Sequence, residues 1–167
     1  MEKMKNNSLH KLVFMFFLAF LFTCAIPTQV FGIESDSDST IIVNMDDMKL
    51  IETLSDTTEG KPEFKGPAPG LSSVTIADYG YLPNGNFGVV VQVMGYGNPQ
   101  TATFNGRPCN LVGEQYITSG GNVIVGWFHT YDCGPVTQPG SYNFSTTYRS
   151  VVSPYGTITR NATFNFG

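Results

Sequence analysis

Aromatic residues are the main resource for ligand binding in this sequence. The single tryptophan and several tyrosines lie in or beside turns rich in glycine, proline and asparagine; the set is Tyr79, Tyr81, Tyr96, Trp127, Tyr131 and Tyr155. Sugar rings stack their C–H faces on such rings, and nearby amides such as Asn84, Asn98 and Asn122 can bind the hydroxyls. Because most aromatic residues of a β-protein belong to its core, packing is the competing interpretation of the same set.

Catalytic chemistry has little support in the sequence. His129 is the only histidine after residue 32, and a triad with Asp132 would need a serine that no motif identifies. Asp78, Glu114 and Asp132 could supply the two carboxylates of a glycosidase, but the three acids are isolated from one another in the chain. The motifs G-x-S-x-G and H-E-x-x-H and the phosphate-binding loop are absent. We therefore predict a non-enzymatic protein without a cofactor or metal, and keep a carboxylate-dependent hydrolase as a third hypothesis.

The amino end predicts export. Three lysines, Lys3, Lys5 and Lys11, precede an apolar run from Leu12 to Phe22, and Pro27 follows it. The run is shorter than the roughly 20 residues that cross a bilayer, so residues 1–32 are predicted to be a secretory signal peptide cleaved after Gly32. Lipidation at Cys24 and an uncleaved anchor helix are the two alternatives. We expect a secreted protein with no stable membrane insertion after the signal is removed.

Removal of the signal leaves two cysteines, Cys109 and Cys133. An even pair in an exported chain predicts one disulfide, and two free buried thiols are the alternative. Both cysteines lie beside chain reversals, which places the bond at the ends of strands. A metal site is disfavoured because two cysteines and one histidine do not complete a shell of four ligands.

Charge divides the remaining chain into two regions. Residues 33–66 carry nine acids and three lysines, whereas residues 67–167 carry three acids and three arginines. We therefore predict an acidic, flexible leader with a Pro/Gly linker over residues 33–70, within which Met45, Met48, Ile51 and Leu54 are spaced for one face of a short helix. A solvated tail, a pro-segment cut near Lys61 or Lys65, and a calcium site at Asp36-x-Asp38 are the open interpretations. A neutral domain behind an acidic leader has no electrostatic footprint for nucleic acid.

Residues 71–167 alternate with the period of β-strands. The clearest pair comes last: Tyr142, Phe144 and Tyr148 share one face of a strand, and Ile158, Ala162, Phe164 and Phe166 share one face of the next. Asn105-Gly106 is typical of a hairpin turn, and the apolar run around Val89 to Val93 is typical of a central strand. About seven strands in roughly 100 residues predict an all-β, antiparallel, two-sheet sandwich.

The last strands resemble a known architecture. Pro139-Gly140-Ser141-Tyr142 is similar to the entry into the penultimate strand of immunoglobulin-like and fibronectin-III-like domains, where the tyrosine packs at a corner. The resemblance covers roughly residues 71–166 and implies an immunoglobulin-like fold. The spacing of Cys109 and Cys133 departs from the inter-sheet pair of antibody domains. The whole chain also resembles small exported proteins of unknown function from Gram-positive bacteria.

These observations favour extracellular binding or surface interaction, with a polymer, a protein or a competitor's molecule as the partner. The partner class is therefore an extracellular protein or carbohydrate. A secreted toxin or inhibitor with a removable acidic pro-segment is the alternative.

Overall fold

The computed structural model describes residues 38–51, 68–120 and 123–167. The chain divides into two compact units, residues 1–32 and 33–167, and every described residue belongs to the second. Several predictions therefore concern residues outside the described ranges: the signal peptide with Cys24, the calcium site at Asp36, the cleavage sites at Lys61 and Lys65, and the positions of Leu54 and Asn122.

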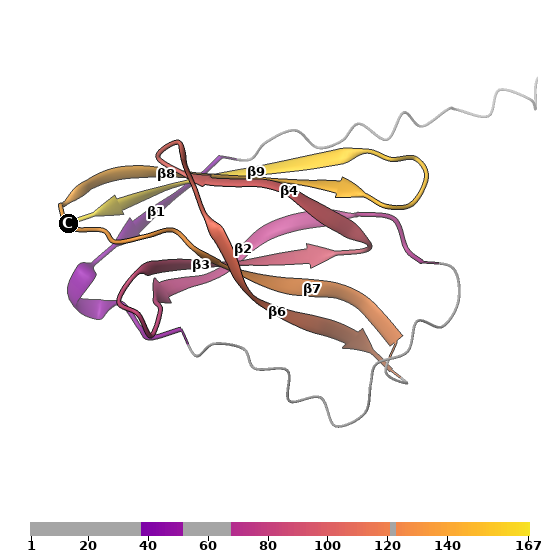
Figure 1. The fold of residues 1–167 in the computed structure, drawn as a ribbon, viewed down its shortest axis with the longest axis horizontal. Coiled ribbons are helices and arrows are strands. Elements are labelled where there is room, and N and C mark those ends of the chain that lie inside the picture. Colours follow the sequence, from indigo (N-terminus) through magenta and orange to yellow (C-terminus); the bar gives the residue numbers. More distant parts are fainter. Residues whose placement is uncertain (1–37, 52–67, 121–122) are drawn as a thin grey trace, which may run out of the picture. The chain divides into compact units, whose positions relative to one another are not determined.

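Within these described ranges, nine strands form two sheets (Figure 1). In spatial order, the first sheet contains β1 (Ser39–Val43), β9 (Thr157–Phe166), β8 (Gly140–Ser150), β4 (Gly97–Phe104) and β5 (Arg107–Pro108). The second contains β2 (Ser73–Tyr81), β3 (Phe87–Met94), β7 (Val123–Asp132) and β6 (Asn110–Ser119). Every pairing is antiparallel except that of β1 with β9, which is parallel. The prediction of an all-β, two-sheet fold is confirmed, with β1, the short β5 and β6 as strands that the sequence did not predict, residues 110–119 having been expected to be irregular.

The described residues contain one short helix, the 3₁₀ turn η1 (Met45–Asp47). Within those residues no helix has the length and apolar character needed to span a membrane.

The last two strands pair as their alternation predicts. Tyr142 lies opposite Phe164 and Phe144 lies opposite Ala162. Phe144 and Phe164 are buried in the core that both sheets share, so their common face is the inner face. The hairpin turn is also confirmed, because Asn105 and Gly106 both have positive φ (48° and 74°) between the paired residues Phe104 and Arg107.

Strand β3 lies at the centre of its sheet and supplies the middle of the core. Phe87, Val89, Val91 and Val93 are fully buried on one face of the strand. The ring of Phe87 contacts Phe104, Phe164 and Phe166 at centroid distances of 5.1 to 5.3 Å. Each such side chain stabilises the fold by roughly 1.5–3 kcal/mol through burial, so this cluster holds the two sheets together.

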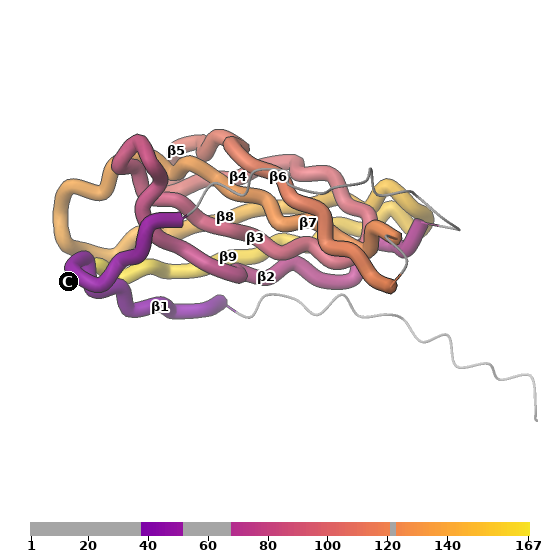
Figure 2. Tube along the Cα trace, turned by 90° about the horizontal axis from the view of Figure 1, so that it is seen from below, coloured from indigo at the N-terminus to yellow at the C-terminus, as the bar shows by residue number. Residues whose placement is uncertain are grey.

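The leader differs from its prediction. Residues 39–51 were expected to be peripheral and partly helical, but β1 joins the sheet beside β9, Val43 is 1% exposed, and Ile51 is 6% exposed. Figure 2 shows β1 along the outer edge of the described part of the molecule, next to β9. Asn44 caps the helical turn η1, because its side chain accepts a hydrogen bond from the Asp46 amide at 3.2 Å, but the helix is only one turn long.

Two physical features account for the position of the described leader residues 39–51. The alternation of Ile41 and Val43 gives β1 an apolar face, and the edge of β9 supplies unpaired backbone groups that β1 satisfies. Farther along, the backbone of Lys49 and Ile51 bonds to Tyr81 on β2. A Cβ atom at Gly80 would lie 2.2 Å from the Lys49 carbonyl oxygen, so glycine is required where the leader crosses the sheet.

Candidate functional site

A small cleft opens between the two sheets where β4 faces β6 and β7. Its volume is about 170 Å³, and its described lining residues are Tyr96, Gly97, Asn98, Pro99, Glu114, Trp127, His129 and Val151. β4 belongs to one sheet, and β6 and β7 belong to the other. The cleft therefore lies at the open side of the sandwich, where an edge strand leaves the inner face accessible.

Aromatic rings form one wall of the cleft. Tyr96 and Trp127 meet edge to face with centroids 4.9 Å apart, and Tyr116 lies 6.5 Å from Trp127. The hydroxyl of Tyr96 donates to the Ile124 carbonyl oxygen at 3.1 Å, which fixes the ring. Tyr116 lies opposite Trp127 in the pairing of β6 with β7, so the two rings share a face.

An acid and a histidine form the floor. Glu114 lies opposite His129 in the same pairing, and Glu114 Oε1 is 3.4 Å from His129 Nε2. The Glu114 side chain is 58% exposed, whereas that of His129 is 3% exposed. Burial lowers the pKa of His129 below its usual 6.5, although the charge of Glu114 acts in the opposite direction. At neutral pH the imidazole is therefore uncharged, and the carboxylate is left without a cationic partner in the cleft.

A chain of hydrogen bonds continues from His129 into the core. The Tyr148 hydroxyl is 2.7 Å from His129 Nδ1, and the Tyr131 hydroxyl is 2.7 Å from that of Tyr148. Because a carboxylate only accepts, the neutral imidazole directs its Nε2–H at Glu114, and Nδ1 must accept from Tyr148. Tyr131 then donates to Tyr148, so all four groups are ordered in one direction.

Tyr131 and Tyr148, the two tyrosines of this hydrogen-bonded network, are not reactive groups. Burial raises the pKa of Tyr148 and that of Tyr131. Both hydroxyls therefore stay protonated at neutral pH and act only as hydrogen-bonding groups. They position His129 rather than supply a nucleophile.

The structure separates the six predicted aromatic residues. Tyr96 and Trp127 line the cleft, and Tyr131 lies in the core behind it. Tyr79 packs against the core rings Phe87 and Phe164. Elsewhere, Tyr81 pairs with the leader backbone, and Tyr155 is 62% exposed beyond the end of β8.

Sequence reasoning missed the pairing of Glu114 with His129 and the roles of Tyr116 and Tyr148. The alternation of β7 places residues 127, 129 and 131 on one face, and that of β6 places residues 114 and 116 on one face. What the sequence lacked was the register between β6 and β7. Two irregularities in this pairing, between Leu111 and Gly113 and between Ile117 and Thr118, set that register.

The three acids do not form a shared site. Asp132 accepts hydrogen bonds from Asn84 and Asn86, each at 2.9 Å, and from the Gly134 amide at 2.8 Å. Burial tends to raise the pKa of Asp132, but these hydrogen bonds prevail and the pKa is lowered. Asp132 therefore stabilises a turn through these hydrogen bonds. The acidic neighbour of His129 is Glu114 rather than Asp132.

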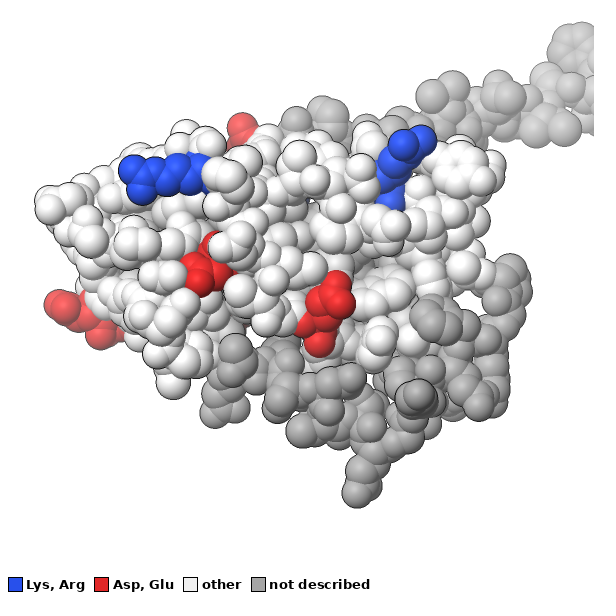
Figure 3. Space-filling view, viewed as in Figure 1, with Lys and Arg blue, Asp and Glu red and all other residues white. Residues whose placement is uncertain are grey.

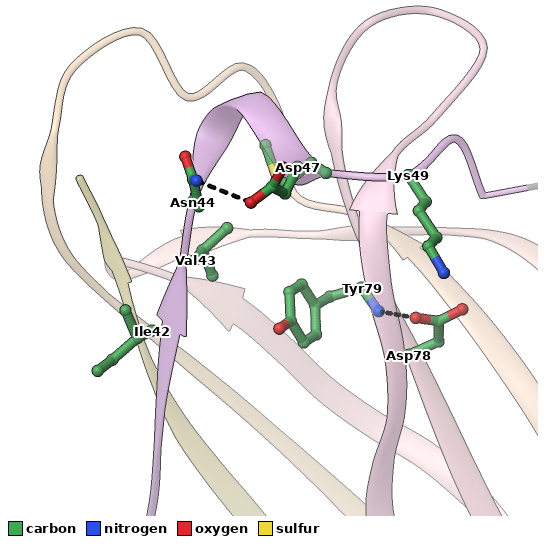
Figure 4. A pocket seen from close by; sticks show the side chains of 8 residues that line it. Ile42, Val43, Asn44, Asp47, Lys49, Asp78 and Tyr79 are labelled. Atoms are coloured by element: carbon green, nitrogen blue, oxygen red, sulfur yellow. Dashed lines mark hydrogen bonds between the residues drawn. The ribbon is translucent and has the colours of Figure 1, made fainter.

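Asp78 lies in a different hollow, which Figure 4 shows from close by. This hollow of about 370 Å³ lies between β1, η1 and β2, and Tyr79 and Lys49 also line it. Its polar groups bond to their own neighbours: Asn44 donates to Asp47 at 2.8 Å, and Asp78 accepts from the amide of Tyr79 at 2.8 Å. No group of three or more metal-binding side chains occurs among the described residues.

The two cysteines meet, but they are not bonded in this structure. The sulfur atoms of Cys109 and Cys133 are 3.2 Å apart, and both residues are free thiols. A disulfide requires a sulfur–sulfur distance near 2.05 Å, so the predicted bond is absent here while the predicted proximity is present. The hydrogen bond with Cys109, together with burial, raises the pKa of the Cys133 thiol, which makes it a poor nucleophile.

Charged side chains are sparse on the face seen in Figure 3, where isolated acids and bases are separated by broad uncharged areas. A larger hollow of about 650 Å³ on the outer face of the second sheet is lined mainly by apolar and amide side chains, among them Val90, Phe128 and Gln92, together with the carboxylate of Asp78. Phe128 is its one aromatic lining residue among those described, so it lacks the pair of contacting rings beside an acid that the cleft has. The cleft is therefore the candidate site because of its chemistry and not because of its size.

Comparison with known proteins gives one match. The model of a family described as a domain of unknown function (DUF4879) matches residues 81–165. The matched range contains every described residue that lines the cleft. No curated protein and no solved structure gives a significant match.

Proposed function

The chain belongs to the family described as a domain of unknown function (DUF4879), and we propose that it is a secreted, non-enzymatic protein that binds one sugar ring of an extracellular polymer in the cleft. The observation that carries this proposal is the convergence of Tyr96 and Trp127 with the polar groups of Asn98 and Glu114. An aromatic wall takes the C–H face of a pyranose, and the amide and carboxylate oxygens accept from its hydroxyls. The small volume favours one ring over a longer segment.

The same geometry argues against catalysis. A glycosidase needs two carboxylates facing each other across the scissile bond, and Glu114 is the single carboxylate among the described lining residues. His129 has both ring nitrogens engaged, one by Tyr148 and one by Glu114. The described cleft thus offers groups that recognise a ligand but no pair that would transfer a proton across one.

Three finer features belong to the same proposal. An immunoglobulin-like arrangement is supported by Tyr142, whose hydroxyl donates to the Gln138 carbonyl oxygen at 3.0 Å, as in a tyrosine corner. Export is supported by the lysines and the apolar run at the amino end. In an oxidising compartment the close sulfur atoms of Cys109 and Cys133 would form a disulfide, and thiol titration of the secreted protein tests this.

The alternative, a toxin or inhibitor released from its acidic leader, fits less well. Cleavage near Lys61 or Lys65 would detach β1 and remove Val43 and Ile51 from buried positions. It would also leave the edge of β9 unpaired. Amino-terminal sequencing of the secreted protein separates the two hypotheses, because a start near residue 33 supports binding and a start after residue 61 supports the alternative.

Fluorescence offers a direct test, since Trp127 is the only tryptophan in the chain and lines the cleft. The protein is titrated with cellohexaose, xylohexaose, mannohexaose and N-acetylchitohexaose while its emission is followed. At least one oligosaccharide should shift the emission with saturation, and calorimetry should show that Trp127→Ala weakens this binding at least tenfold. Tyr155→Ala is the control, because it removes an exposed ring outside the cleft.

Two results would contradict the proposal. If none of the four oligosaccharides changes the emission, nor any other sugar polymer, the cleft does not bind sugar. If Tyr155→Ala weakens binding as much as Trp127→Ala, the sugar binds somewhere else.

A further inference from the structure

We propose that the ligand of the cleft is an amino sugar whose free amine is protonated, held by the carboxylate of Glu114 against the rings of Tyr96, Tyr116 and Trp127. This inference rests on the proposed function and names the class of sugar. It follows from the charge of the cleft and from the geometry of its walls.

The charge of the cleft is negative and has no cation to balance it. Glu114 is the only side chain of fixed charge among the described residues that line the cleft. Arg149, on β8, lies opposite Asn98 in the strand pairing. However, Arg149 is exposed, whereas its neighbours Tyr148 and Ser150 are buried, so alternation directs the guanidinium to the outer face of the sheet.

The neighbour of Glu114 does not neutralise it either. His129 is buried and accepts a hydrogen bond from Tyr148 at Nδ1, which orders the imidazole as a neutral donor. Its Nε2–H engages Oε1 of Glu114 and so orients the carboxylate. The second carboxylate oxygen can then accept a hydrogen bond from an ammonium group of the ligand, and such a charge-assisted bond is stronger than one to a hydroxyl.

The walls suit a cation as well as a sugar face. Aromatic rings attract an ammonium group that lies within about 6 Å of a ring centroid. Tyr96 and Trp127 line the cleft together with Glu114, and Tyr116 lies next to Trp127. Glu114 and Tyr116 project from the same face of β6, next to Trp127 and His129 on β7. A phosphorylated or carboxylated sugar would meet the same carboxylate as a like charge and be repelled.

Three oligosaccharides with the same β-1,4 backbone and different groups at carbon 2 test the inference. Fully deacetylated chitohexaose carries an ammonium, N-acetylchitohexaose an acetamide, and cellohexaose a hydroxyl. Binding is followed by Trp127 emission and by calorimetry, in mildly acidic buffer where the amine is protonated. The deacetylated hexamer should bind about tenfold more tightly than cellohexaose, which corresponds to one charge-assisted hydrogen bond.

Glu114→Gln is the matched variant, because it keeps the shape of the side chain and removes its charge. It should lower the affinity for the deacetylated hexamer by about tenfold and the affinity for cellohexaose by a clearly smaller factor, because the Gln amide still hydrogen-bonds a hydroxyl but no longer attracts an ammonium group. The acidic leader is intact in this variant, so binding of the cationic sugar to the leader would persist. Thermal unfolding of the variant checks that it is folded.

The outcomes separate the two proposals. Equal affinity for the deacetylated hexamer and cellohexaose would overturn the amino-sugar inference and leave sugar binding intact. Preference for the deacetylated hexamer that survives Glu114→Gln would also overturn it, because the charge would then act through the leader. If no sugar of any kind binds, the proposed function fails together with the inference.

Discussion

The space between the two sheets is filled in two different ways. Around Phe87 it holds only rings and aliphatic groups, with Phe104, Phe164 and Phe166 in mutual contact. Around Tyr148 it holds an imidazole and two phenolic hydroxyls in a hydrogen-bonded chain that ends at Glu114. The first region is suited to stability alone, because apolar contacts have no preferred partner. The second orders polar groups that need specific partners, and this is the region that opens to a cleft.

The largest effect is expected from Phe87→Ala. The variant leaves a cavity at the centre of the apolar cluster and should lower the free energy of unfolding by about 3–5 kcal/mol. Urea denaturation followed by circular dichroism measures this loss. A loss below about 1 kcal/mol would mean that the apolar region does not hold the two sheets together.

Tyr148→Phe should have a smaller but still large effect. It removes the hydroxyl that donates to His129 and accepts from Tyr131, so two buried polar groups lose a partner at the cost of little volume. We expect a loss of about 1–3 kcal/mol in the free energy of unfolding. Phe144→Leu, a change in the same strand without a polar group, is the control for packing. Unchanged stability of Tyr148→Phe would show that the chain of hydrogen bonds contributes nothing.

The two regions should also differ in how their contribution to stability depends on pH. The pKa of His129 is lower in the folded protein than its usual 6.5, so the unfolded state binds the proton more readily. Stability from this group is therefore complete above about pH 6.5 and decreases as the pH falls toward the lowered value, by at most about 1.4 kcal/mol for each unit. His129→Gln should weaken the dependence of the denaturation midpoint on pH below about pH 6.5. A variant with the same pH profile as the wild type would contradict the assignment.

The smallest effect on stability is expected from Glu114→Gln. The carboxylate is more than half exposed, and its histidine partner is neutral, so the free energy of unfolding should change by less than about 0.5 kcal/mol. Differential scanning calorimetry measures the change. A large loss would place Glu114 among the residues that hold the fold, and its role in the cleft would have to be reconsidered.

Local patterns predicted most of the strands that pair with a neighbour in sequence, but not β6, the partner of β7. The faces of β8 and β9 were predictable because Phe144 and Phe164 follow a strict alternation across one hairpin. β1 was not predictable, because its partner lies at the other end of the chain and the surrounding acids suggested a solvated tail. The composition of a segment does not show which distant strand that segment will pair with.

Only part of the candidate site was predicted, because the sequence does not show how distant strands are placed against one another. Trp127 and Tyr96 were expected to be ligand-binding residues, and the structure places both in the cleft. The contact between Glu114 and His129 depends on a register with two irregularities, and alternation alone does not place them. Tyr148 was placed on the same strand face as Phe144, but the partner of its hydroxyl lies on the opposite sheet and could not be inferred from its own strand.

The parallel pairing of β1 with β9 also constrains the order in which the strands can join the first sheet during folding. The first described strand has no other partner in its sheet, and its partner is the last strand of the chain. During synthesis, or passage through a narrow channel, β1 stays unpaired until residues 157–166, which form β9, have emerged. A chain with such distant contacts gains its final strand late and slowly, so premature closure of this sheet is disfavoured by the connectivity itself.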